Sequence, residues 1–86
     1  MLKLKTFYFT FGCESPLADF VQMVRAPDLV TARAGMFRYY HNKWYGCYDT
    51  AKYVSDGKCA IFNAVYKVLD KVITARNESE IECTYL

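Results

Sequence analysis

Residues 32–49, ARAGMFRYYHNKWYGCYD, carry most of the information about the fold. Aromatic and sulfur-containing side chains gather here around what reads as the end of a helix and the strand that follows it. Together with the apolar segment TFYFTFG at residues 6–12, this stretch predicts one compact domain that combines helix and sheet. It contains no set of residues typical of a catalytic centre.

The size and composition of the chain predict a single small domain, residues 1–86. Its 86 residues are near the small end of the domains that fold without disulfides or metal, and a hydrophobic fraction of 53% supplies an ample core. The longest apolar run is only a few residues, so we expect no membrane span. The first residues, MLKLK, lack the apolar segment and cleavage site of a signal peptide, which predicts a cytoplasmic protein.

The four cysteines, at positions 13, 47, 59 and 83, form no C-x-x-C pair and lack the spacing of a zinc site. In a cytoplasmic protein we therefore expect free thiols that pack as small apolar side chains. The sequence predicts no metal site and no cofactor.

The net charge of +2 is unevenly distributed along the chain. Residues 33–76 carry eight basic and three acidic side chains, whereas residues 77–86 carry three glutamates and no basic residue. The basic middle excludes acidic mimicry of a DNA duplex, and it permits weak attraction to nucleic acid or to an acidic protein surface. A solvated surface of mixed charge is the simpler alternative.

The periodicity of the first half predicts two strands, a helix and a third strand. On a helical projection Leu29, Ala32, Met36 and Tyr40 share the expected core face, while Gly35 lies opposite. Glycine there costs about 1 kcal/mol relative to alanine, so either another element packs close to it or the position is weakly selected. The expected elements are strands Leu4–Phe11 and Asp19–Ala26, a helix from Leu29 to about His41–Asn42 with Asp28 as its N-cap, and strand Trp44–Tyr48.

The second half predicts a second helix, from about Lys58 to Ala75, capped by residues 55–57. Its apolar residues form one stripe at a 3.6-residue period, although its many β-branched residues leave a strand open over part of it. Ile81–Leu86 alternates and reads as a short edge strand. The expected fold is therefore α+β, an antiparallel sheet of three to four strands with two packed helices, in the order β-β-α-β-α-β.

Residues suited to chemistry are few. His41 is the sole histidine, at a helix end, and Asp49 is the one acidic partner near it in sequence. No G-x-S-x-G elbow or glycine-rich phosphate loop is present. We therefore predict no catalytic residue and no enzymatic activity.

Surface residues around the first helix end are the better candidates. Arg38, Lys43 and Tyr45 are predicted to form a partner-binding site, Arg38 from the polar helix face and Tyr45 from the sheet face opposite Trp44. Cations beside aromatic rings suit a protein hot spot or the stacking of single-stranded bases. A place at the margin of the core is the simpler alternative.

Several motifs resemble a group of small uncharacterised proteins from phages and prophages of Gram-positive bacteria. These are Thr6-Phe-x-Phe-Thr-Phe-Gly12, Pro16-Leu17, Ala32-Arg33-x-x-Met36-Phe37, Lys43-Trp44 and Tyr48, over roughly residues 5–50. At His41-Asn42 the pattern of that group has glycine, so the helix ending differs.

The resemblance implies an accessory protein of a mobile element that binds and disables host machinery. Anti-CRISPR proteins are the best-populated group of this kind. The expected function is thus stoichiometric inhibition of a host defence protein, a CRISPR nuclease or its guide complex, in the host cytoplasm. A small RNA- or single-stranded-DNA-binding module and a homodimeric assembly protein remain the alternatives.

Overall fold

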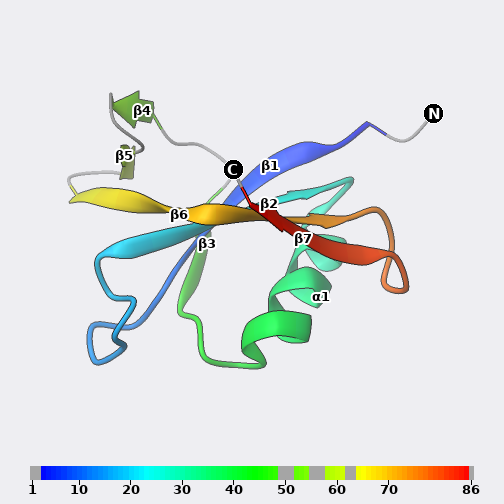
Figure 1. Cartoon of the computed structure of the whole chain (residues 1–86), viewed down its shortest axis with the longest axis horizontal. Coiled ribbons are helices and arrows are strands. Elements are labelled where there is room, and N and C mark those ends of the chain that lie inside the picture. The colour runs from blue at the N-terminus through cyan, green and yellow to red at the C-terminus, as the bar shows by residue number, and fades with distance from the viewer. Residues whose placement is uncertain (1–2, 49–51, 55–57, 62–63, 86) are drawn as a thin grey trace.

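The computed structural model describes residues 3–48, 52–54, 58–61 and 64–85. Seven strands and one helix follow one another in this part of the chain (Figure 1). They are β1 (Lys5–Thr10), β2 (Phe20–Ala26), α1 (Leu29–Tyr40), β3 (Gly46–Tyr48), β4 (Lys52–Val54), β5 (Lys58–Ile61), β6 (Ala64–Ala75) and β7 (Ile81–Tyr85).

The strands form one mixed, curled sheet. Six of them follow the order β3-β1-β2-β6-β5-β4, and β7 also pairs with β6. Neighbouring strands are antiparallel except β2 and β6, which are parallel. Lys67 of β6 pairs with both Phe20 of β2 and Lys58 of β5, while Thr74 pairs with both Arg25 and Glu82. Strand β6 therefore holds β2 along one edge, and β5 and β7 along the other.

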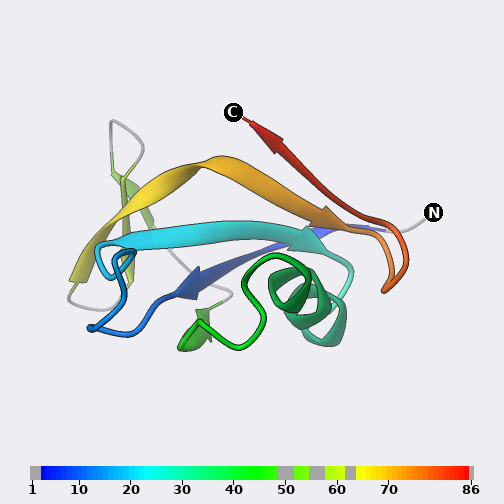
Figure 2. The same ribbon diagram turned by 60° about the horizontal axis from the view of Figure 1, so that its bottom comes forward.

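The two faces of this sheet are covered by different elements (Figures 1 and 2). Helix α1 lies on one face, and the β4–β5 hairpin rises on the other side at the opposite end of β6. Between α1 and the sheet lies a core that includes the fully buried Phe9, Val24, Met36 and Ile73. A second apolar cluster joins Tyr8, Val21, Cys59 and Ile61. The central strands thus bury apolar side chains on both faces.

The prediction of a second helix over residues 58–75 is wrong, and with it the fold of three to four antiparallel strands and two helices. This segment forms strands β5 and β6. Leu69 and Ile73 pack against the helix-side core, whereas Val68 belongs to the opposite cluster and Val72 is buried. A strand that is buried on both faces has apolar residues at neighbouring positions. Some of these residues are therefore three or four positions apart, which is also the spacing of an apolar stripe on a helix. The β-branched content, which favours strands, was the better signal.

The other predicted strands and the predicted first helix are confirmed, with ends within two residues of the expected ones. The predicted N-cap of the helix is confirmed as well. The Oδ1 of Asp28 accepts a hydrogen bond of 2.8 Å from the backbone N–H of Thr31 at the start of α1. The last expected strand residue, Leu86, and the expected cap at residues 55–57 lie outside the described residues.

The expected core face of α1 is only partly right. Ala32 and Met36 are fully buried, but Leu29 is 39% exposed and Gly35 is buried. A Cβ at Gly35 would lie 3.1 Å from Cγ2 of Ile73, so the helix backbone packs directly on β6. Of the two explanations for Gly35, close packing is therefore the correct one.

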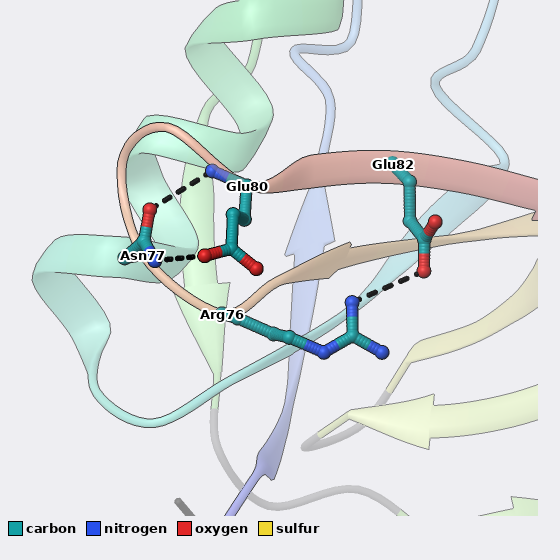
Figure 3. Close-up of polar contacts among 4 residues, drawn as sticks. All are labelled: Arg76, Asn77, Glu80 and Glu82. Atoms are coloured by element: carbon teal, nitrogen blue, oxygen red, sulfur yellow. Dashed lines mark hydrogen bonds and ion pairs between the residues drawn. The ribbon is translucent and has the colours of Figure 1, made fainter.

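The β6–β7 connection is closed by local polar contacts (Figure 3). The Oδ1 of Asn77 accepts hydrogen bonds from the N–H groups of Ser79, at 2.7 Å, and Glu80, at 2.9 Å. An exposed ion pair joins Arg76 and Glu82 at 3.2 Å. The turn lies at the end of the sheet far from the Gly12–Asp19 loop (Figures 1 and 2).

Candidate binding surface

Two adjoining hollows lie where β1 ends and β3 begins. The larger, here called the tyrosine hollow, has a volume of about 820 Å³. The second, the tryptophan hollow, has about 620 Å³. Gly12, Glu14 and Tyr45 line both of them. The tyrosine hollow is also lined by Asp19, Tyr48 and Tyr66, and the tryptophan hollow by Asn42, Lys43 and Trp44.

The Gly12–Asp19 loop forms one wall of both hollows and is held by its own backbone. The N–H of Ser15 donates to the carbonyl of Gly12 at 2.9 Å, and the N–H of Ala18 donates to Ser15 at 3.1 Å. The carbonyl of Asp19 accepts from the N–H of Lys67 in β6 at 2.9 Å. The parallel pairing of β2 with β6 therefore brings this loop beside Tyr66.

The opposite wall is set by the turn that ends α1. His41 has φ 56° and ψ −120°, and the N–H of Lys43 donates to the carbonyl of Tyr40 at 3.0 Å. These values describe a type II′ turn with His41 at its first central position, where glycine is preferred. The carbonyl of His41 accepts from Nε1 of Trp44 at 2.9 Å, which fixes the indole after the turn.

Trp44 and Tyr45 point in different directions. The Trp44 ring meets Phe9 edge-on, with 5.1 Å between ring centroids, and packs against the core. The backbone N–H of Tyr45 donates to the carbonyl of Thr10 at 2.9 Å, whereas its side chain is 72% exposed. A backbone held by β1 thus presents a rigid, exposed aromatic ring between the two hollows.

The structure brings together two of the three residues predicted to bind a partner. Lys43 and Tyr45 line the same hollow, and both are exposed. Arg38 is exposed in the last turn of α1, and it lines neither the tyrosine hollow nor the tryptophan hollow.

Sequence reasoning missed the acidic and tyrosine lining of the larger hollow. Glu14 lies between two predicted strands, Asp19 begins the second of them, and Tyr66 lies in the predicted second helix. Nothing local indicates that residues 14, 48 and 66 line one hollow. That juxtaposition arises from the β1–β3 and β2–β6 pairings.

Charges alternate along this surface. The described lining of the tyrosine hollow contains Glu14 and Asp19 and no basic side chain. Lys43 lines the adjoining tryptophan hollow, and Lys58 and Lys67 line a recess of about 210 Å³ that Asp19 also lines. The tyrosine hollow is therefore a negative site flanked by positive groups.

A separate polar cluster lies under α1 and stabilises the fold. Gln22 is fully buried; its Nε2 donates to the carbonyl of Lys71 at 2.8 Å, and its Oε1 accepts from the hydroxyl of Tyr40 at 2.8 Å. Burial raises the pKa of Tyr40 above 10.0, against the opposing charge of Lys71. Because these groups satisfy one another, we assign them a structural role.

No metal-binding group of three or more histidine, cysteine or acidic side chains occurs in the described parts of the chain. Cys13 is exposed, Cys47 and Cys83 are half-buried, Cys59 is buried, and no disulfide joins these four described residues. Among the described residues, no helix is long and apolar enough to cross a membrane.

Comparison with protein-family models, with curated proteins and with solved structures gave no match to this chain. A proposed function therefore rests on this surface and on the motif resemblance over residues 5–50.

Proposed function

We propose that this protein acts by stoichiometric binding of another protein, through the surface formed by Tyr45, Lys43 and the two hollows, and without catalysis. The observation that carries the proposal is the exposed Tyr45 ring between hollows of about 820 and 620 Å³. A tyrosine on a rigid backbone gives large contact area with little loss of conformational freedom, which is why Tyr dominates hot spots.

The identity of the partner follows from the resemblance over residues 5–50. We take the chain as an inhibitor of a host defence protein, with a CRISPR nuclease or its guide complex as the leading target inside the host cell. The basic middle of the sequence and the exposed Lys43 suit an acidic patch on such a protein.

The test compares matched tyrosine variants. Tyr45 is 72% exposed and Tyr85, on β7, is 79% exposed, so both substitutions by alanine remove a similar exposed ring. Tyr45→Ala should weaken capture of the partner from host lysate by about 10-fold or more, as hot-spot truncations do. Tyr85→Ala should leave capture and melting temperature near the wild type. Equal capture by wild type and Tyr45→Ala would refute the site.

The target is tested separately. A purified CRISPR nuclease complex from a candidate host should lose DNA cleavage at one equivalent of wild-type protein and retain it with Tyr45→Ala. Unchanged cleavage at excess protein would remove this target, while leaving protein binding to be judged by the capture assay.

Single-stranded nucleic acid is the second candidate, because Lys43 and Tyr45 line one hollow and suit a phosphate and a base. Affinity for an oligonucleotide that falls log-linearly with salt would favour it. Absence of such binding, with protein capture intact, would favour the inhibitor.

A further inference from the structure

We infer that the tyrosine hollow receives an arginine side chain presented by the partner protein. This inference rests on the proposed function and specifies the chemistry of the partner. The inference is based on two carboxylates, Glu14 and Asp19, and three tyrosines that line the same hollow. The described lining of this hollow has no basic group.

Charge complementarity selects a cation as the occupant. Glu14 and Asp19 are both exposed, and within the part of the chain that the structure describes neither forms an ion pair with a basic side chain. A cation that enters the tyrosine hollow therefore meets two carboxylate acceptors that have no ion pair to give up. An anionic ligand would face both carboxylates, which disfavours it by like-charge repulsion.

The aromatic lining selects arginine over lysine. Tyr45, Tyr48 and Tyr66 line the same hollow, and the π-face of a tyrosine attracts a cation within about 6 Å. A guanidinium is planar, stacks on such rings and donates two parallel hydrogen bonds to a carboxylate. An ammonium is a strongly hydrated point charge and gains less from this lining.

The lysines near the tyrosine hollow indicate which charges the partner protein carries beside its arginine. Glu14 also lines the tryptophan hollow together with Lys43, and Asp19 also lines the smaller recess together with Lys58 and Lys67. A partner surface with an arginine between acidic groups would match this order of charges along the site. The lysines also disfavour a purely basic partner segment.

The first experiment uses the full chain labelled with ¹⁵N and titrated with an acetylated, amidated peptide Gly-Glu-Gly-Arg-Gly-Glu-Gly. Chemical shifts should change in the Gly12–Asp19 loop and at Tyr45 and Tyr66. The matched control peptide carries citrulline, which has nearly the shape of arginine but no charge. It should bind at least about 10-fold more weakly, since hydrogen bonds to charged groups are the stronger ones.

Three results of the peptide titration would overturn the inference. They are equal affinity for the citrulline peptide, shifts that map away from the hollow, and no shift at millimolar arginine peptide. Guanidinium ion that binds as tightly as the peptide would also overturn it, because the site would then serve a small cation.

The second experiment uses substitutions that keep shape and remove charge. The Glu14→Gln/Asp19→Asn variant should lose at least about 10-fold in affinity for the arginine peptide, because both acceptors lose their charge. Glu78→Gln removes an exposed acid at the far end of the sheet and should change nothing. Unchanged affinity of the double variant would contradict the inference. If Tyr45→Ala abolishes partner capture while the double variant captures fully, only the arginine assignment fails; if Tyr45→Ala captures fully, the proposed function fails.

Discussion

Replacing His41 by glycine should stabilise this protein. His41 is the one non-glycine residue with positive φ among the described residues, at φ 56° and ψ −120°. L-residues with a side chain seldom adopt this region, and holding one there costs about 1–3 kcal/mol. Glycine adopts it without steric cost and is the usual residue at this position of a type II′ turn.

Two effects of the His41→Gly substitution reduce the expected gain in stability. Glycine makes the unfolded chain more flexible, which opposes folding by about 0.4–1 kcal/mol. The edge-on contact between the rings of Phe37 and His41, 5.6 Å apart, is also removed, but Phe37 is 60% exposed, so we assign the contact at most about 0.5 kcal/mol. The hydrogen bond from Trp44 is kept, because its acceptor is the backbone carbonyl of residue 41. The net expectation is about 1 kcal/mol of added stability.

Thermal and urea unfolding measure this change. For a domain of this size, about 1 kcal/mol raises the melting temperature by about 4–8 °C. Asn42→Gly is the matched control: its residue has no positive φ, so glycine should only destabilise, by up to about 1 kcal/mol. His41→Ala keeps the unfavourable backbone and loses the ring contact, so it should not stabilise. A His41→Gly variant no more stable than wild type would refute the reasoning.

Three further predictions follow from side chains buried against the sheet. Gly35→Ala should lower the free energy of unfolding by about 1 kcal/mol despite better helix propensity, because the new Cβ would lie 3.1 Å from Cγ2 of Ile73; higher stability in urea would mean that α1 can move away. Tyr40→Phe should cost about 1–3 kcal/mol, because Oε1 of the buried Gln22 loses its hydrogen bond; a variant with wild-type stability would show that water replaces the hydroxyl. Burial raises the pKa of Tyr40 above 10.0 and of Cys59 above 9.0, so the unfolded state releases these protons first and stability falls as pH rises above about 9. Urea titrations at pH 8 to 11 should show that the free energy of unfolding falls with pH. Above pH 10 this fall should be less steep in Tyr40→Phe than in the wild type. If the free energy of unfolding falls equally steeply in both proteins, Tyr40 is excluded as a cause.

Local sequence signals pointed to two residues of the candidate binding surface, Lys43 and Tyr45, but not to the rest of its lining. Lys43 follows the helix end and Tyr45 lies opposite Trp44, and both positions can be read from the helix stop and from strand alternation. Glu14 and Asp19 carry no such signal, because a carboxylate in a turn reads as solvated wherever the turn lies. Arg38 was placed correctly on an exposed helix face, yet its distance in space from the hollows depends on how α1 packs.

The sequence by itself determined the elements whose pattern is local: β1, β2, α1 with its Asp28 cap, and the end of that helix near His41. Only the tertiary structure decided that Lys58–Ile61 and Ala64–Ala75 form strands, because the C-terminal part of β6 buries Val72 on one face and Ile73 and Ala75 on the other, and such apolar positions match either period. The close contact of Gly35 with Ile73, and the meeting of Glu14 with Tyr66, likewise depend on parallel pairing between β2 and β6. Such pairing joins segments more than 40 residues apart, and local propensity carries no information about which distant strand will be the neighbour.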